Sequence, residues 1–265
     1  MKTKTIIDAL GNKVSIPYPP QRIISTVPST TEFLFHLGLD KFVVGRTRYC
    51  RYPSDRIKKI PNIGGPKDLH MNKIRLLDPD LIFANEEENS REQIIALSKN
   101  YPVYVCKIRS LEDALDNIWV TGIITGTKTK AQQTISLIQQ GFSKLPAPSQ
   151  KLRAAYIIWK DPYISVGKDT FINDMMRRCG LKNVFEDHKG RYPRITPQEL
   201  QEASPQLVLL ASEPYPFGET NIPQFKQLLP KAHLQLVDGE MFAWYESHLL
   251  RAIPYFRELI KQLHG

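Results

Sequence analysis

The sequence lacks several features by which common protein classes are recognised. It has only three cysteines, Cys50, Cys106 and Cys179. Their odd number and wide spacing indicate neither a disulfide framework nor a Cys-x-x-Cys metal clip. Cys50 alone is flanked by cations, Arg48 and Arg51, which would lower a thiol pKa. The longest apolar runs, such as DLIFA and QLVLLA, fall far short of the roughly 18 residues of a membrane-spanning helix.

Catalytic and cofactor motifs are also missing. The chain contains no Gly-x-Gly-x-x-Gly, Walker loop, Gly-x-Ser-x-Gly or His-Glu-x-x-His sequence, so we expect no enzyme activity and no intrinsic cofactor. The six histidines show no metal-ligand spacing. Two alternatives stay open: a chelatase that uses His248 with Glu246, and a receptor for a bare divalent metal with several converging ligands.

The first residues, MKTKTIIDALGNKVS, lack the apolar core of a secretion signal. As written, the sequence predicts a cytoplasmic protein. A periplasmic or cell-surface location is expected instead if a leader has been removed or missed.

The charge balance is basic, with a net charge of +9 and a pI near 9.4. Such a balance favours an anionic ligand or nucleic acid, but the basic residues are scattered and no nucleic-acid-binding motif accompanies them. We therefore predict a solvated basic surface and no nucleic-acid partner. The acidic run Glu86–Glu88 is interpreted as a solvated loop with Ser90 capping the next helix, or alternatively as a patch for a basic partner.

What the sequence does contain is a repeat. An apolar helical stretch ends in Gly38-Leu39, and a second one ends in Gly180-Leu181. Each is followed by a turn proline and a strand-like run, LLDPDLIFAN in the first half and EASPQLVLLAS in the second. Two similar units in the same order predict two lobes with a ligand cleft between them.

Strand-like and helix-like segments alternate along both halves, which predicts an α/β fold with parallel sheets flanked by helices. The first residues, KTIIDALGNKVSIP, indicate two short strands around a Gly-Asn turn. A helix capped by Ser29 and ended by Gly38 follows. We predict an N-terminal lobe over residues 1–127, a connecting helix over 128–148, and a C-terminal lobe over 149–265.

Aromatic and cationic residues gather in the predicted loops that follow strands, where ligands bind in such folds. Flat rings provide contact area at low entropic cost, and arginines bind carboxylates or phosphates in bidentate fashion. The candidates from these loops are Arg46, Arg48, Tyr49, Trp159, Tyr163, Arg191, Tyr192, Phe242, Trp244 and Tyr245.

With these residues in view, the chain resembles the substrate-binding proteins of cobalamin and ferric-siderophore importers, the helical-backbone metal receptor family. The resemblance runs over nearly the whole length, and its most specific segments are DALGNKVSIPYPPQRIISTVPSTTEFLFHLGL, LLDPDLIFA, ISVGKDTFINDMMRRCGLKNVF and YPRITPQELQEASPQLVLL. It implies two Rossmann-like lobes joined by one long helix, with the ligand in a cleft between them.

The segment GRTRYCRYP is most similar to the cobalamin-binding branch of that family, so the resemblance implies a metal chelate as ligand, with a corrinoid favoured. It implies that Tyr49 and Tyr192 contact the corrin, whereas a third aromatic of the branch is replaced by Pro66. The alternative ligand is heme or a ferric siderophore held by Arg46, Arg48 and Arg191.

Family members that dock on an ABC permease use one exposed glutamate on each lobe. In this chain those positions hold Asn72 and Gln198, with Glu199 adjacent to the second. The permease partner is thus one expectation, and a cytoplasmic chelate-binding protein without a permease is the other. The resemblance implies a monomer.

Overall fold

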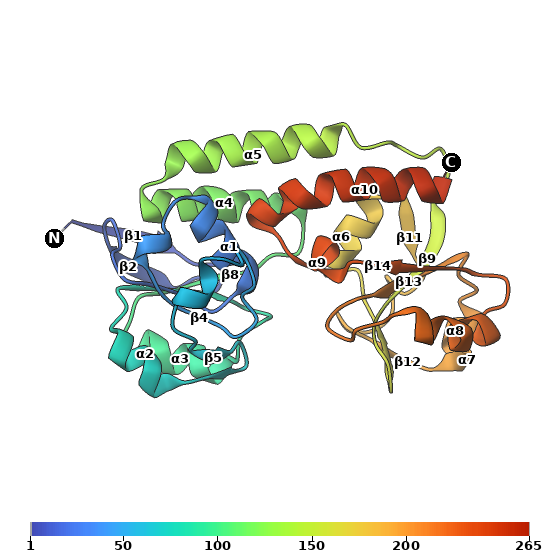
Figure 1. The fold of residues 1–265 in the computed structure, drawn as a ribbon, viewed down its shortest axis with the longest axis horizontal. Helices are drawn as coiled ribbons and strands as arrows, with labels where there is room; N and C mark the ends of the chain where they lie inside the picture. Colours follow the sequence, from blue (N-terminus) through green and yellow to red (C-terminus); the bar gives the residue numbers. More distant parts are fainter. Residues whose placement is uncertain (1, 265) are drawn as a thin grey trace. The chain divides into compact units, whose positions relative to one another are not determined.

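The computed structural model describes residues 2–264, which form two compact units (Figure 1). Unit 1 contains the chain up to Ile108, Glu112–Ile138 and Tyr245–His248. Unit 2 contains Arg109–Leu111, Gln139–Trp244 and the chain from Leu249 onward. Each unit therefore includes a short segment from the other half of the sequence.

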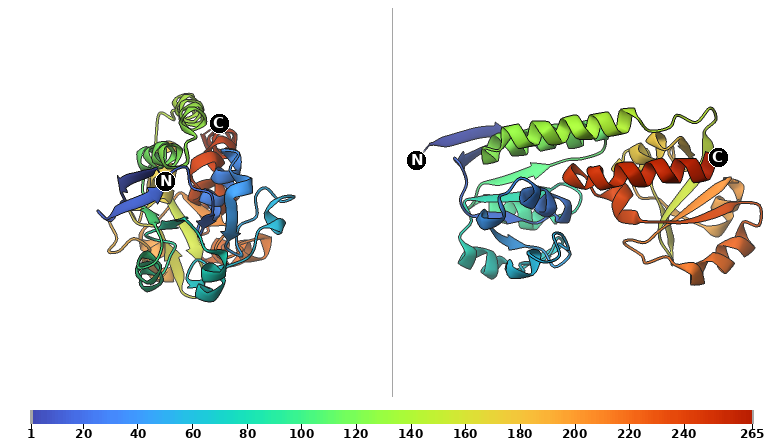
Figure 2. Two further views of the ribbon diagram at one scale, coloured as in Figure 1. Left: turned by 90° about the vertical axis from the view of Figure 1, so that its left-hand side faces the viewer. Right: turned by 45° about the horizontal axis from the view of Figure 1, so that its top comes forward.

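Unit 1 is built around a four-stranded parallel sheet with the strand order β4-β3-β7-β8. The sheet strands are β3 (Ile23–Ser25), β4 (Val43–Arg46), β7 (Leu81–Asn85) and β8 (Val103–Cys106). The helices are α1 (Pro28–His36), α2 (Met71–Leu77), α3 (Arg91–Ser98), α4 (Leu111–Thr125) and α5 (Lys128–Ser143), of which α5 runs on into unit 2. Two short antiparallel pairs complete it, β1 (Thr3–Ile7) with β2 (Lys13–Pro17) and β5 (Gly64–Gly65) with β6 (Asp68–Leu69). The β1–β2 pair confirms the predicted hairpin and lies at the start of the chain (Figure 2).

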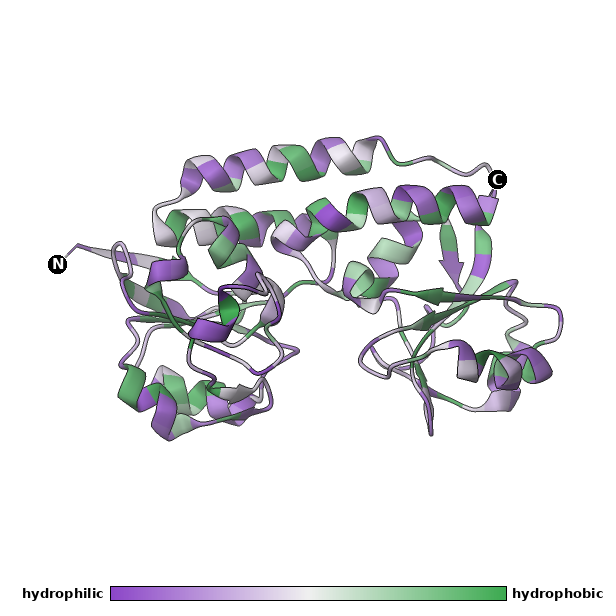
Figure 3. Ribbon diagram, viewed as in Figure 1, coloured by the Kyte–Doolittle hydropathy of each residue, from purple (hydrophilic) through white to green (hydrophobic). Residues whose placement is uncertain are grey.

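Unit 2 contains a six-stranded sheet in which β9 (Leu152–Trp159) is central. The other strands are β10 (Tyr163–Ser165), β11 (Leu181–Asn183), β12 (Arg194–Ile195), β13 (Leu207–Ala211) and β14 (His233–Val237). The helices are α6 (Phe171–Arg178), α7 (Pro197–Glu202), α8 (Ile222–Leu228), α9 (Gly239–Ala243) and α10 (Leu249–His264). Along α10, buried apolar residues such as Leu249, Ile253, Phe256 and Ile260 recur at helical spacing, visible as alternating hydrophobic and hydrophilic bands (Figure 3).

The sequence repeat corresponds to a repeat of topology. Strands β9, β11, β13 and β14 are mutually parallel in the order β11-β9-β13-β14, which matches the order β4-β3-β7-β8 of unit 1. The two Gly-Leu units occupy equivalent places, after α1 and after α6. Gly38 and Gly180 both have a positive φ, +81° and +74°, which a residue with a Cβ adopts only under strain. The predicted α/β fold with parallel sheets is confirmed.

Helix starts show where local prediction succeeded and where it failed. Ser90 caps α3 as expected, because its hydroxyl accepts a hydrogen bond from the Gln93 N–H. The predicted cap of α1 at Ser29 is wrong, since that helix begins at Pro28 with Val27 at the cap position and no side-chain cap. Proline suits the first helical position because its φ is already helical and it has no N–H to satisfy.

The segment Tyr245–His248 is buried within unit 1 and supplies hydrogen-bond partners to its polar interior. Glu246 Oε1 accepts from Asn117 Nδ2 at 2.7 Å and from Thr30 Oγ1 at 3.4 Å. His248 Nδ1 lies 2.8 Å from Glu32 Oε2, and the His248 side chain is fully buried. His248 and Glu246, the residues of the chelatase alternative, thus form hydrogen bonds with other residues inside unit 1.

The buried position of Glu246 favours its protonated form. Burial raises the pKa of its carboxyl group to about 8, and nearby Glu88 and Glu32 raise it further, while the hydrogen bonds from Thr30 and Asn117 oppose the shift. Oε1 accepts the bonds described above, while Oε2 has no hydrogen-bond partner among residues 2–264. Glu246 also has a φ of +62°, an uncommon backbone conformation for a side chain of this size.

Glu246→Gln should flatten the dependence of stability on pH. The folded-state pKa lies above the unfolded value of about 4.3, so the folded protein binds this proton more tightly. This contribution is fully present below the unfolded pKa and is lost as pH rises through about 8, at up to about 1.4 kcal/mol per pH unit. Urea unfolding across that range should show a steeper decline for the wild type than for Glu246→Gln, with exposed Glu219→Gln as the control. Parallel curves for the wild type and Glu246→Gln would contradict the assignment.

Gly122→Ala should destabilise unit 1 although alanine is the better helix former. A Cβ at Gly122 would lie 2.5 Å from the Ala131 Cβ, so α4 and α5 would have to separate locally. The cost of overpacking, roughly 1–3 kcal/mol, exceeds the helix-propensity gain of up to about 1 kcal/mol.

The matched control is Gly218→Ala, since a Cβ there has nothing within 4 Å and the φ is −148°. Denaturant unfolding should show a loss for Gly122→Ala and little change for Gly218→Ala. A gain in stability for Gly122→Ala would show that the helices separate without cost.

Candidate functional site

In unit 1, Arg48 and Tyr49 lie in the loop that follows β4. The backbone of this loop is held in place, since the Arg48 N–H donates to Gly64 O at 2.8 Å. The Arg48 guanidinium forms an ion pair with Asp68 and lies over the Tyr49 ring, 5.9 Å from its centroid. Tyr49 is 53% exposed, so its aromatic ring is accessible to solvent beside the Arg48–Asp68 ion pair.

Gly65 allows Asp68 to approach this loop. A Cβ at Gly65 would lie 2.2 Å from Asp68 Oδ1 and 3.5 Å from the Arg48 Cζ. Any larger residue would displace the aspartate that pairs with Arg48. The neighbouring Pro66 is half-buried, and its carbonyl accepts from Asn89 Nδ2 at 3.1 Å, so it adds less surface than an aromatic residue would.

Cys50 has no sign of the reactivity that its cationic neighbours suggested. Its side chain is buried, and burial raises its pKa, which outweighs the hydrogen bonds from Thr31 and Thr47 and the charge of Arg46. The expectation of a lowered pKa is wrong because desolvation is the larger effect. Arg46 itself donates to Thr47 O at 3.0 Å.

In unit 2, Arg191 and Tyr192 repeat this arrangement. The Arg191 guanidinium lies 5.8 Å from the centroid of the Tyr192 ring, and Tyr192 is 36% exposed. Arg191 Nε donates to the Asp169 carbonyl at 2.7 Å and lies 4.0 Å from Asp169 Oδ2. Arg109 Nη1 binds the same carboxylate at 2.5 Å. The role of Asp169 was not foreseen, because it precedes the loop by more than twenty positions.

Trp159 is the last residue of β9 and Tyr163 is the first residue of β10, and the two side chains differ in their exposure to solvent. Trp159, the last residue of β9, is 39% exposed and stands edge-on to Tyr215 at 5.7 Å. Tyr163 is buried against Phe225, and its hydroxyl accepts from Gln224 Nε2 at 2.8 Å. Burial raises the pKa of Tyr163, with a smaller effect of Asp161, so its hydroxyl is neutral.

The strand register shows how Trp159 and Tyr192 are related within the sheet of unit 2. Ile164 of β10 pairs with Trp159 on one side and with Arg194 of β12 on the other. Tyr192 lies two residues before Arg194, at the amino-terminal end of β12, whereas Trp159 is at the carboxyl end of β9. Trp159 and Tyr192 are thus carried on either side of β10, with Arg194 level with Trp159 and Tyr192 two residues before that level.

The aromatic run near residue 245 is divided between the two units. Phe242 is fully buried in unit 2 against Tyr156 and Phe256, with ring centroids at 5.1 and 4.9 Å. Trp244 is buried in unit 2 and donates through Nε1 to Glu213 Oε1 at 3.0 Å. Tyr245 is buried in unit 1, where its hydroxyl accepts from Asn85 Nδ2 at 3.0 Å. These three rings are therefore packed in the interiors of the units. Among the predicted aromatic residues, the exposed ones are Tyr49, Trp159 and Tyr192.

A receptor for a bare metal ion would need several converging ligands. Among residues 2–264, no group of three or more His, Cys, Asp or Glu side chains could hold a metal ion. His36 lies 3.0 Å from Thr134 Oγ1, and His188 lies 3.6 Å from Glu199. Over the same residues, no helix is long and apolar enough to cross a membrane.

The two positions aligned with docking glutamates are exposed and uncharged. Asn72 lies in the first turn of α2, and Gln198 lies in α7, where it donates to Glu202 Oε1 at 2.9 Å. The adjacent Glu199 caps α7, since its Oε2 accepts from the Thr196 N–H at 2.7 Å. Glu199 is therefore already engaged by the helix terminus.

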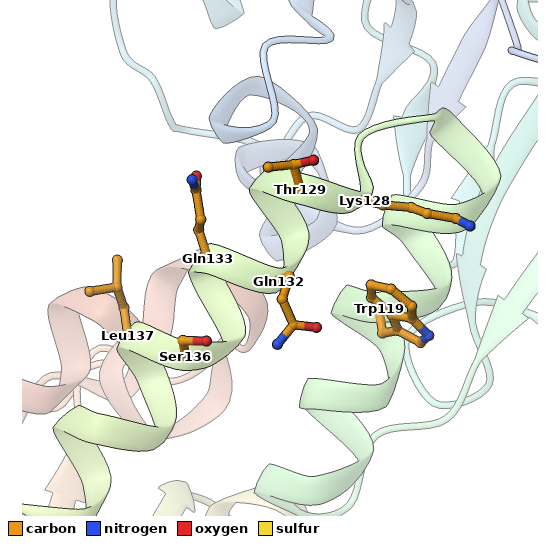
Figure 4. A pocket seen from close by; sticks show the side chains of 7 residues that line it. All are labelled: Trp119, Lys128, Thr129, Gln132, Gln133, Ser136 and Leu137. Carbon is orange, nitrogen blue, oxygen red and sulfur yellow. The ribbon is translucent and has the colours of Figure 1, made fainter.

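A separate groove lies within unit 1 between α4 and α5. Figure 4 shows Trp119 of α4 beside Lys128 and Gln132 of α5, with Leu137 farther along. Its lining contains no histidine, cysteine or carboxylate, and none of the predicted ligand-binding residues. It has the composition of a surface hollow between packed helices and offers no metal ligand or acid–base pair.

Comparison with curated proteins gives two relatives with names that describe binding proteins. The chain is 28% identical over 216 residues to the ABC transporter substrate-binding lipoprotein YvrC of Bacillus subtilis, covering 77% of this chain and 68% of that protein. It is 24% identical over 196 residues to the Vitamin B12-binding protein of Vibrio cholerae, covering 72% of this chain and 71% of that protein.

Solved structures share the fold at lower identity. The periplasmic vitamin B12-binding protein BtuF of Vibrio cholerae superimposes with a TM-score of 0.77 at 20% identity, covering 93% of this chain and 98% of that one. The periplasmic heme-binding protein BhuT, in complex with two hemes, superimposes with a TM-score of 0.79 at 19% identity, covering 92% and 99%.

The family model described as periplasmic binding protein matches residues 23–230, which is more than half of the sequence. The match includes the strands of both parallel sheets up to β13 and the loops that carry Tyr49 and Tyr192. On this evidence, the chain belongs to the periplasmic binding protein family.

Proposed function

We propose that this protein is a non-enzymatic carrier that binds a corrinoid for an ABC importer. In this proposal Tyr49 of unit 1 and Tyr192 of unit 2 stack on the macrocycle or its substituents. Trp159 adds apolar contact at the edge. The observation that carries the proposal is the pair of exposed tyrosines, each backed by an arginine that is itself held by an aspartate.

The state of the arginines favours a corrinoid over an anionic chelate. Arg48 pairs with Asp68, Arg46 donates to a backbone carbonyl, and Arg191 donates to the Asp169 carbonyl near its carboxylate. Cyanocobalamin carries peripheral amides and no net charge, so its recognition needs aromatic contact and neutral hydrogen bonds rather than free cations. The relatives named as vitamin B12-binding proteins support the same ligand class.

Heme is the second candidate, because heme-binding proteins are among the structural neighbours. Its two propionates, like the acidic groups of a ferric siderophore, would need guanidinium partners. Arg48 and Arg191 could serve by exchanging the aspartate for the ligand carboxylate, or by sharing the guanidinium group with it at a cost in repulsion.

Docking on a permease would follow different chemistry from that of relatives with paired glutamates. At Asn72 and Gln198 this chain offers amides, which form hydrogen bonds but no ion pairs with permease arginines. The absence of glutamate at Asn72 and Gln198 is also the basis of the alternative, a chelate carrier that acts without a permease.

Tyr49→Ala and Tyr192→Ala should each weaken cyanocobalamin binding roughly ten- to a hundredfold, the effect of losing one well-buried aromatic contact. Isothermal titration of the purified chain should give saturable one-to-one binding for the wild type. Leu137→Ala is the matched control, since Leu137 is 55% exposed on α5 outside the proposed surface.

Hemin and a ferric catecholate are titrated in parallel. Binding of either without cyanocobalamin binding would favour the anionic-chelate alternative. Unaltered cyanocobalamin affinity in both tyrosine variants would remove these rings from the site.

A further inference from the structure

The topological repeat places the two Arg–Tyr pairs in loops that follow corresponding strands. Arg48-Tyr49 follows β4, and Arg191-Tyr192 follows β11, and these strands hold the same place in the two parallel sheets. In both pairs the guanidinium lies over the ring, at 5.9 and 5.8 Å from the centroid. The same dipeptide with the same geometry thus recurs in both units.

Each pair also has one aspartate, supplied from a different part of the chain. Asp68 comes from β6, after its arginine, and Asp169 comes from the loop before α6, ahead of its arginine. Since the aspartates do not share a position in the repeat, their occurrence beside both arginines is not a simple result of the repeated sequence.

The aspartates determine what each guanidinium can offer a ligand. A ligand carboxylate that approaches Arg48 must displace Asp68 or accept repulsion from it, because the two carboxylates would share one cation. A neutral amide has no such conflict and can accept a hydrogen bond from an N–H of the arginine that the aspartate leaves accessible. The Arg48 and Asp68 side chains are 41% and 63% exposed, so the pair lies where a ligand could reach it.

In unit 2, Arg109 shares the aspartate with Arg191. Its Nη1 holds the Asp169 carboxylate at 2.5 Å, while the Asp169 carbonyl holds Arg191. The Asp169 side chain remains 47% exposed. Replacing the aspartate with asparagine would remove the carboxylate that Arg109 binds and that lies near Arg191.

We propose that Asp68 and Asp169 are specificity-determining residues, which make the two Arg–Tyr pairs select ligands with amide or other uncharged groups over ligands with carboxylates. The inference rests on the proposed function and goes beyond it, since it assigns charge selectivity to two residues that need not contact the macrocycle. Selectivity of this kind arises by penalising the competitor rather than by strengthening the preferred ligand.

The test compares two ligands of the same shape. Cyanocobalamin and its isomeric monocarboxylic acids, in which one peripheral amide is hydrolysed, differ by a single charge. Dissociation constants are measured by titration at neutral pH and low ionic strength for the wild type, Asp68→Asn, Asp169→Asn and the double variant. The wild type should prefer the amide. Each single variant should shift the preference toward at least one acid isomer by about fivefold, the scale of one partly exposed charge pair.

The charge-matched control is Asp116→Asn with Glu219→Gln, which removes one exposed carboxylate from each unit away from these pairs. An unchanged ratio in the aspartate variants with cyanocobalamin binding intact would overturn this inference alone. An equal shift in the control would overturn it too, since net charge would then be the cause. If the wild type binds neither corrinoid, the proposed function fails and the inference with it.

Discussion

Hydrogen bonding between residues far apart in the sequence is the constraint on which unit 1 depends. Asn117 and Glu246 are 129 positions apart, and Glu32 and His248 are 216 positions apart, yet each pair is joined inside the same unit. Asn117, Glu246 and His248 are buried, and a buried group without its partner costs about 1–3 kcal/mol. The reciprocal segment, Arg109–Leu111, serves unit 2, where the Leu111 N–H donates to Asp174 Oδ2 at 2.9 Å and Arg109 binds Asp169.

Local charge compensation distinguishes the proposed ligand surface from the protein as a whole. The chain carries a net charge of +9, which by itself favours anionic ligands. At the two exposed tyrosines, however, the nearest arginines face aspartates. The net charge therefore bears on the general attraction of the protein to anionic molecules. The choice of ligand depends instead on the short-range pairing of Arg48 and Arg191 with aspartates.

Much of the fold could be predicted because it depends on local patterns. The alternation of β-branched runs with amphipathic segments gave the α/β class, and the two Gly-Leu units gave the repeat that the strand orders confirm. Gly38 and Gly180 could be placed at helix ends because a positive φ has a specific residue preference. Ser90 was predictable as a cap, while Ser29 was not one, since the proline before it already provided the helix start.

The candidate site was less predictable, because it depends on long-range packing. Phe242, Trp244 and Tyr245 are consecutive or nearly so, but tertiary structure buries them in two different units. Asp68 and Asp169 had no signal of their own, since nothing local links an aspartate to an arginine some twenty residues away. The thiol of Cys50 was misjudged for the related reason that sequence neighbours reveal charge but not desolvation.

Because Tyr245–His248 belongs to unit 1, the position of this segment late in the chain also affects when unit 1 can finish folding during synthesis. When the ribosome has released the first half of the chain, Asn117, Asn85 and Glu32 have the backbone of unit 1 around them but not their partners from 245–248. Domains generally fold as they emerge, but this unit can reach its final hydrogen bonding only when almost the entire polypeptide has been translated.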